Sequence, residues 1–181
     1  MSKRAILVVD LQNEYFPGGK LLLTGIEAAS ANAARVIAAA RASGDRVIHI
    51  RHEFPGANTP FFTPGTEGVQ IHPSVKPEND EPVILKNYPN SFVKTELKAM
   101  LDADNIEEVV VVGAMSHMCV EATSRAASDF GYKVTVVHDA CATLDLEFNG
   151  VTVPATQVHA TAMAALAFAY ATLRSTAEYL A

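Results

Sequence analysis

The sequence predicts an α/β protein: a three-layer αβα Rossmann-like fold with a six-stranded, mainly parallel sheet. Two observations support this fold class. Short β-branched runs alternate with alanine-rich segments of helical length along the 181 residues, which is the pattern of repeated β–α–β units. The strand runs are apolar at nearly every position, as expected where helices cover both faces of a sheet. The length fits one domain, predicted to span residues 1–181.

The N-terminal part of the chain holds the first two predicted strands and the first helix. Residues 5–10 (AILVVD) and 45–52 (DRVIHIRH) are the apolar, β-branched runs. Residues 27–44 between them are rich in alanine and end at Gly44, which is typical of a helix and its C-terminal cap.

A long segment rich in proline and glycine, residues 52–81, precedes the third predicted strand at 81–86 (EPVILK). Loops of this length in compact domains are usually functional or disordered. This one also contains Phe54, Phe61 and Phe62. We therefore expect it to pack as the wall of a pocket.

The C-terminal half is predicted to continue the alternation of strands and helices. Ser91 is placed to cap one helix, Gly131 to end the next, and Pro154 suits the first turn of the last. Helices are expected over 91–105, 117–130 and 154–171, and strands over 106–113, 132–140 and 172–176.

Composition excludes several classes of protein. The net charge is −6, whereas nucleic-acid-binding chains usually carry a basic patch, so no nucleic-acid partner is expected. No apolar run reaches the length of a membrane span, and the N-terminal run ends at Asp10, too early for a secretory signal. We therefore expect no membrane association and a cytoplasmic location. No G-x-G-x-x-G motif follows the first strand, which disfavours dinucleotide binding.

Three chemically capable residues follow or end predicted strands. Asp10 ends the first strand, Lys86 ends the third, and Cys119 follows the fourth at the start of a helix. In open α/β sheets, ligands bind at the carboxyl ends of the strands. We therefore expect these side chains to meet at one edge of the sheet, although singly each also fits a plainer role in packing, turns or solvation.

Together these residue types suit acyl transfer through a thioester. A helix start and a nearby lysine both lower the pKa of a cysteine thiol, so Cys119 is expected to be a reactive thiolate. A carboxylate such as Asp10 can take the thiol proton and return it to a leaving amine. Backbone N–H groups in a tight strand-to-helix turn can form an oxyanion hole.

Three motifs occur along the chain in this order: VVDLQNEYFPGG (8–19), VILKNYPNSF (83–92) and VVGAMSHMCVEATSRAASDFGYKVTVVHDACAT (111–143). Together they resemble the isochorismatase-like cysteine hydrolases, which include nicotinamidases, N-carbamoylsarcosine amidohydrolases and isochorismatases. The resemblance implies a catalytic triad in which Asp10 is general base and later acid, Lys86 stabilises the thiolate, and Cys119 is the nucleophile. It also implies a cis peptide bond between Ala114 and Met115, with the N–H groups of Met115 and Cys119 forming the oxyanion hole.

The resemblance also implies a substrate pocket and an oligomer. The pocket residues would be Gln12, Tyr15, Phe92, His117 and Met118. Core packing is the alternative for Phe92 and Met118, and contact with solvent or a second subunit is the alternative for His117. Members of this family usually form dimers or tetramers, so we expect a homo-oligomer that acts on a small-molecule substrate.

One motif of the nicotinamidases is absent. Those enzymes bind a metal through an Asp-x-His pair after the second strand, and the corresponding IHIRHEFPG (48–56) contains no such pair. His49, His52 and His72 are therefore expected to be strand or loop residues rather than metal ligands. Neither a metal nor another cofactor is expected.

Three functions remain open. The leading one is hydrolysis of a C–N bond in a small amide, carbamoyl or ureido compound through a thioester on Cys119. Isochorismatase-type hydrolysis of a vinyl ether is an alternative that would need Asp10 as proton donor but not Cys119. The third is a redox-responsive or binding protein that uses the same thiol, for which a sulfenic acid or a Cys119–Cys141 disulfide under mild oxidation would be the sign.

Overall fold

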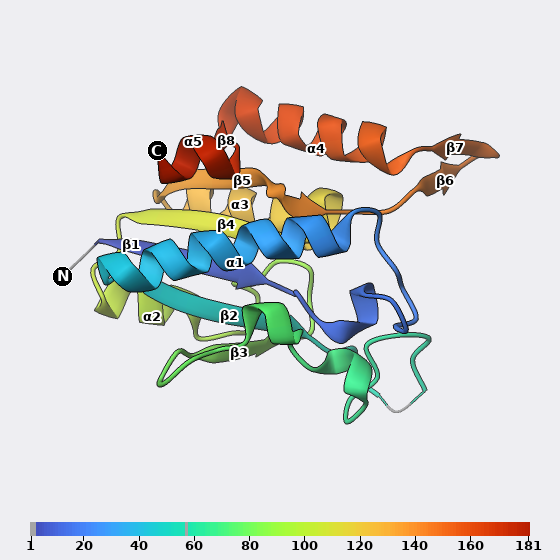
Figure 1. Cartoon of the computed structure of the whole chain (residues 1–181), viewed down its shortest axis with the longest axis horizontal. Helices are drawn as coiled ribbons and strands as arrows, with labels where there is room; N and C mark the ends of the chain where they lie inside the picture. The colour runs from blue at the N-terminus through green and yellow to red at the C-terminus, as the bar shows by residue number, and fades with distance from the viewer. Residues whose placement is uncertain (1–2, 57) are drawn as a thin grey trace.

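The computed structural model describes residues 3–56 and 58–181 and shows three layers, a central sheet between two layers of helices (Figure 1). Residues 1, 2 and 57, which belong to the predicted domain and its long loop, lie outside the described part. The strands are β1 (Arg4–Val9), β2 (Arg46–His52), β3 (Val83–Lys86), β4 (Glu108–Ala114), β5 (Lys133–Ala142), β6 (Leu146–Phe148), β7 (Val151–Val153) and β8 (Thr172–Arg174). The α-helices are α1 (Ile26–Ser43), α2 (Leu97–Ala103), α3 (Glu121–Asp129), α4 (Ala155–Ala169) and α5 (Thr176–Leu180), and a π-helix (Ser116–Val120) leads into α3.

The central sheet has six strands in the order β3-β2-β1-β4-β5-β8, and every neighbouring pair is parallel. The predicted fold class is therefore confirmed. β2 and β3 lie on one side of β1, and β4, β5 and β8 lie on the other. The connection that follows β1 and the connection that follows β4 therefore run to opposite sides from the carboxyl ends of these two strands. Such a topological switch point is where open α/β sheets bind ligands.

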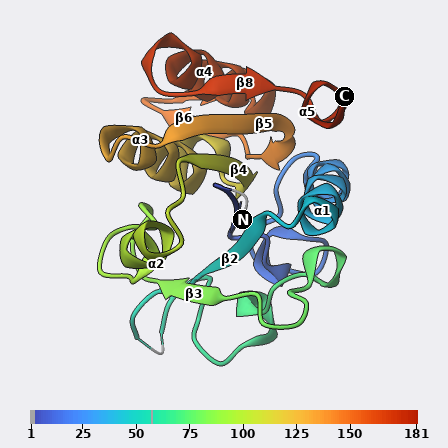
Figure 2. The ribbon, with the colours of Figure 1, turned by 90° about the vertical axis from the view of Figure 1, so that its left-hand side faces the viewer.

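Two hydrophobic cores lie on opposite faces of the sheet, and β1 contributes to both. Ala5, Leu7 and Val9 belong to the core that includes residues of α2, α3 and α4. Ile6 and Val8 belong to the core that includes residues of α1, with α5 at its border. Figure 2 shows these two groups of helices on either side of the sheet. Because successive side chains of a strand point to opposite faces, both faces require apolar residues, which explains the continuous apolar runs.

The pairing of β4 with β1 depends on Gly113. A Cβ atom at this position would lie 2.0 Å from the backbone oxygen of Val9, and φ is +129°. Only glycine fits both the space and this backbone conformation. Gly113 therefore lets β4 run beside β1 up to the connection that carries Cys119.

The helix predicted over 91–105 is shorter than expected. It covers only Leu97–Ala103, and Ser91 does not cap it. The Ser91 hydroxyl instead lies 2.8 Å from the hydroxyl of Thr123 in α3, and the Ser91 amide donates to the same oxygen at 3.1 Å. Tertiary contacts with α3 thus hold this segment in turns.

Other boundaries also differ from the prediction. The helix expected over 117–130 begins as the π-helix at Ser116. Strand β5 extends through Cys141, which was expected to follow the strand. The hairpin β6–β7 and the helix α5 were not predicted.

The long segment 52–81 packs against the rest of the protein, as predicted. The side chains of Phe62, Val69 and Val75 are buried in the core beside α1. Short 3-10 turns at Glu67–Val69 and Pro73–Val75 give the segment local structure. None of the described helices is long and apolar enough to cross a membrane.

Candidate active site

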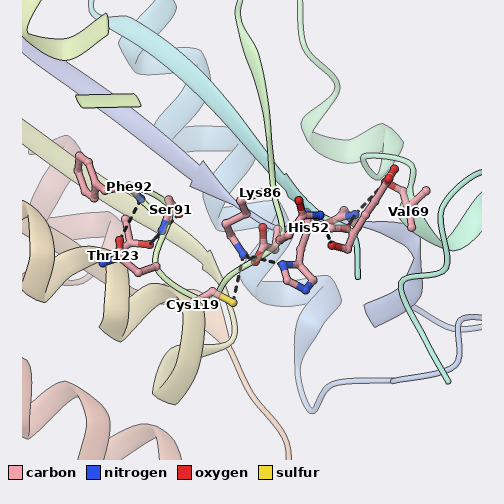
Figure 3. A network of polar contacts seen from close by, with 12 residues as sticks. His52, Val69, Lys86, Ser91, Phe92, Cys119 and Thr123 are labelled. Carbon is pink, nitrogen blue, oxygen red and sulfur yellow. Dashed lines mark hydrogen bonds and ion pairs between the residues drawn. The ribbon is translucent and has the colours of Figure 1, made fainter. Parts of the chain in front are cut away.

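The side chains of Lys86 and Cys119 lie close together at the carboxyl end of the sheet (Figure 3), and Asp10 forms an ion pair with Lys86. Nζ of Lys86 lies 2.7 Å from Oδ2 of Asp10 and 3.4 Å from Sγ of Cys119. The three residues are 0%, 1% and 5% exposed, in the order Asp10, Lys86, Cys119. The structure therefore brings the predicted triad together and isolates it from bulk water.

The ends of two strands position the charged pair. Asp10 follows β1 directly, and its amide still donates to the oxygen of Ile50 at 2.9 Å, so the ladder between β1 and β2 continues to this residue. The φ angle of Asp10 is +52°, a left-handed conformation in which Asp is enriched among non-glycine residues, and it turns the chain away from the sheet. Lys86 ends β3, where buried and exposed residues alternate, on the buried side.

Cys119 lies in the π-helix that follows β4. The amides of Met118 and Val120 both donate to the oxygen of Met115, at 3.0 and 3.2 Å, which closes this turn. The peptide bond between Ala114 and Met115 is cis, as the family resemblance implies. The assignment of the Met115 and Cys119 N–H groups to an oxyanion hole stays a prediction.

The resting state of Cys119 differs from the expectation. Burial and the negative charge of Asp10 raise the pKa of the Cys119 thiol, and the Lys86 ammonium only partly opposes them. The prediction of a low-pKa thiolate is therefore wrong, because the sequence showed the nearby cation but not the depth of burial. Lys86 itself stays charged, because contacts with Asp10 and Cys119 raise its pKa although burial alone would lower it.

A fourth residue, His52, joins this cluster. Its Nδ1 lies 3.2 Å from Nζ of Lys86, and its side chain is buried. Burial and the charge of Lys86 lower the pKa of His52 to about 4, so the imidazole is neutral at physiological pH. Sequence analysis had treated His52 as a strand or loop residue. The usable signal was its position at the end of β2, opposite Lys86 in the strand register.

Gln12, expected in the pocket, instead ties the long loop to the sheet. Its Nε2 donates to the oxygens of His52 and Val69, at 2.9 and 2.8 Å, and its Oε1 accepts from the His52 amide at 2.7 Å. Nearby, Oε1 of buried Glu14 accepts from the Phe62 amide at 2.7 Å. Both side chains are committed to backbone groups, so they support the wall of the site.

Two aromatic residues predicted for the pocket have different surroundings. Tyr15 is buried against Phe62, with ring centroids 5.0 Å apart, and burial raises its pKa, with smaller contributions from the neighbouring Cys119 and Asp10. Phe92 packs against Phe130 at 5.2 Å within the core that includes Cys119. Tyr15 therefore adjoins the reactive cluster, whereas the contacts of Phe92 are those of core packing.

His117 and Met118 precede Cys119 on the outer side of the π-helix. Nδ1 of His117 lies 2.7 Å from the Thr143 hydroxyl, and His117 lines a cavity of about 450 Å³ with residues of β6, β7 and α4. Met118 is 41% exposed, so it is not core filler. His117 is half-buried and Met118 exposed next to Cys119 in the chain, and their role in substrate binding stays a prediction.

Metal ligands do not cluster in the described part of the chain. No group of three or more His, Cys, Asp or Glu side chains there could hold a metal ion. His49 is paired with Glu81 at 3.0 Å, and His72 stacks on Phe16 with ring centroids 3.6 Å apart. These histidines thus have structural partners in the described residues.

The fold and the cluster are those of a class of protein, the α/β-class hydrolases with a cysteine after a central strand. The model of the isochorismatase domain matches residues 4–178. The chain therefore belongs to the isochorismatase family of hydrolases. It is 48% identical to the isochorismatase family protein YddQ of Bacillus subtilis over 176 residues, which covers 97% of this chain and 98% of YddQ. A solved structure of a proposed isochorismatase hydrolase from Oleispira antarctica superposes with a TM-score of 0.94 at 53% identity, covering 98% of this chain and 95% of that one.

Relatives with named activities include amide-cleaving enzymes. Streptothricin hydrolase of Streptomyces noursei is 37% identical, over 79% of this chain and 51% of its own length. Maleamate amidohydrolase of Pseudomonas putida is 29% identical, over 76% of this chain and 71% of its own. Nicotinamidase of Escherichia coli is 27% identical, over 81% and 86%. The family thus includes amidohydrolases that act on different compounds.

Proposed function

We propose that this protein hydrolyses the C–N bond of a small amide, carbamoyl or ureido compound through a thioester on Cys119. The observation that carries the proposal is the buried contact of one ammonium with both a thiol and a carboxylate, Lys86 with Cys119 and Asp10. Relatives named maleamate amidohydrolase and nicotinamidase support the same bond type.

In the first half-reaction, Cys119 attacks the carbonyl carbon of the substrate. Because the thiol is protonated at rest, its proton must leave as the new S–C bond forms. The carboxylate of Asp10 is fully buried and lies within hydrogen-bonding reach of the Cys119 thiol, so it is placed to take this proton. The Lys86 ammonium stabilises the sulfur as it loses the proton, and the N–H groups of Met115 and Cys119 receive the charge on the carbonyl oxygen.

The tetrahedral intermediate then expels the amine, which takes the proton from Asp10, and the thioester that remains on Cys119 completes the first half-reaction. In the second half-reaction, a water molecule attacks the thioester carbon while Asp10 removes one of its protons. The C–S bond breaks, a carboxylic acid product leaves, and Asp10 returns the proton to Cys119. The free thiol and the carboxylate are thereby restored.

The test is ammonia release from a panel of nicotinamide, maleamate and N-carbamoyl amino acids, with and without prior chelator treatment. Cys119→Ala should abolish release while the far-UV circular dichroism stays unchanged. Cys141→Ala is the matched control, because Cys141 lies buried in β5 and its Sγ contacts the oxygen of Val137 rather than the cluster. Release by the control and by the chelated enzyme should equal that of the wild type.

Two results would overturn the proposal. Release that persists in Cys119→Ala would exclude the thioester. No release from any compound, combined with cleavage of isochorismate by both wild type and Cys119→Ala, would establish vinyl-ether hydrolysis instead. A redox role would need a low-pKa thiol, whereas burial raises the pKa of both cysteines, that of Cys141 to about 12.

A further inference from the structure

His52 is the residue of β2 that pairs with Lys86 in the strand register. His52 ends β2, Lys86 ends β3, and their Cα atoms are partners in the parallel ladder. The side chains of such partners lie on the same face of a sheet. Figure 3 shows the His52 ring beside the lysine ammonium, in a different direction from Cys119.

The ammonium of Lys86 has three N–H donors and three neighbours that can accept them. They are Oδ2 of Asp10 at 2.7 Å, Nδ1 of His52 at 3.2 Å and Sγ of Cys119 at 3.4 Å. A buried donor left without an acceptor costs free energy. The three contacts therefore fix both the position and the rotation of the ammonium, and His52 supplies the only one of them that is not a reacting group.

The backbone and ring of His52 are themselves held in place. The side-chain amide of Gln12 accepts a hydrogen bond from the backbone N–H of His52 at 2.7 Å and donates one to its C=O at 2.9 Å. Phe54 and Phe62 meet the imidazole edge to face, with centroids 4.7 and 5.4 Å away. The ring thus has little freedom to rotate, and Nδ1 is kept on Lys86.

We propose that His52 is a positioning residue for the proposed hydrolysis: its neutral imidazole accepts a hydrogen bond from Lys86 through Nδ1 and so holds the ammonium between Asp10 and Cys119. The proposal rests on the proposed function for its effect on turnover, but its effect on the thiol can be measured without any substrate. The low pKa of His52 agrees with it, since a protonated ring would place two cations against each other.

Two variants separate the hydrogen bond from the packing of the ring. His52→Leu fills the space but has no acceptor. His52→Asn keeps an oxygen acceptor at about the place of Nδ1. His49→Gln is the matched control, because His49 is a buried histidine of the same strand whose partner is Glu81.

The first measurement is the rate at which iodoacetamide alkylates Cys119, followed by mass spectrometry across the neutral to alkaline range. In His52→Leu the ammonium loses its anchor and stabilises the developing thiolate less, so we expect about tenfold slower alkylation at each pH. His52→Asn and His49→Gln should stay within about twofold of the wild type. In the wild type, ¹⁵N NMR should show an unprotonated Nδ1 on His52, as the contact with Lys86 requires.

The second measurement is turnover of whichever amide the wild type cleaves. His52→Leu should lower kcat by about 10²-fold with little change in KM, because misplacing a catalytic group by about 1 Å has this effect, and His52→Asn should recover most of the loss. Alkylation at the wild-type rate in His52→Leu, or equal defects in the Leu and Asn variants, would overturn the role of His52. If the wild type cleaves no amide, the proposed function fails while the alkylation and NMR results still decide the role of His52.

Discussion

The buried ion pair between Lys86 and Asp10 can be tested by removing one or both charges. Lys86→Met preserves the length of the side chain, and Asp10→Asn preserves its shape. Both side chains are 0% exposed and the charged atoms are 2.7 Å apart. Removing one partner of such a pair leaves an uncompensated buried charge, which costs about 3–5 kcal/mol. Each single variant should therefore lose about this much free energy of unfolding, a large share of the usual 5–15 kcal/mol for a domain.

The double variant, Lys86→Met with Asp10→Asn, distinguishes the cost of an unpaired buried charge from the cost of lost packing contacts. With both charges gone, no unpaired charge remains, so the loss should fall short of the sum of the single losses by about 1–3 kcal/mol. Urea unfolding followed by circular dichroism at neutral pH measures all four proteins. Losses that add within about 0.5 kcal/mol would show that the two charges do not interact in the folded protein. Turnover should be abolished in all three variants.

Three further predictions concern pH and packing. Burial and the charge of Lys86 lower the pKa of His52 from 6.5 to about 4. As the pH falls from 6.5 to about 4, the unfolded chain therefore binds a proton at His52 that the folded protein does not, and the folded protein loses stability. The difference in free energy of unfolding between the wild type and His52→Leu, measured in urea, should shrink over this pH range. Burial alone would raise the pKa of Glu81, but hydrogen bonds, led by that from Arg41, lower it from 4.5 to about 2. The stability that Glu81 contributes is therefore present above 4.5 and lost towards 2, and the thermal midpoints of wild type and Glu81→Gln should differ at neutral pH and converge in acid. Gly113→Ala should cost at least about 2 kcal/mol in urea unfolding, because its Cβ would overlap the backbone of β1; a loss below about 0.5 kcal/mol would show that the strands can separate at no cost.

The sheet was predictable because its strands are buried on both faces, which leaves a continuous apolar signal in the sequence. The hairpin β6–β7 also had a readable signal that was overlooked. Asn149 and Gly150 have φ angles of 51° and 74°, and they connect the paired residues Phe148 and Val151. A two-residue Asn-Gly turn of this kind is a strong local indication of a hairpin. By contrast, the late start of α2 depends on contacts with a segment 32 residues away and has no local signal.

The position of the triad was predictable from the ends of strands, but its electrostatics were not. Proximity of Lys86 to Cys119 could be inferred from topology, whereas the pKa of the thiol depends on how completely the chain buries it. His52 was missed for a related reason. Its role follows from the register of β2 against β3, and register is a property of strand pairs that the sequence of either strand alone does not specify.

The hydrogen bonds that Gln12 and Glu14 make to the backbone of the long segment divide it into residues with fixed positions and residues that can be replaced. They hold the chain at His52, Phe62 and Val69, so the part of the long segment nearest the cluster is fixed at these points. Phe54, which packs on the His52 ring, belongs to the same fixed set, and the loop residues between these points are the place to introduce new lengths and side chains. An engineer who wants a new specificity should therefore graft loops between these fixed points and leave the chemistry untouched.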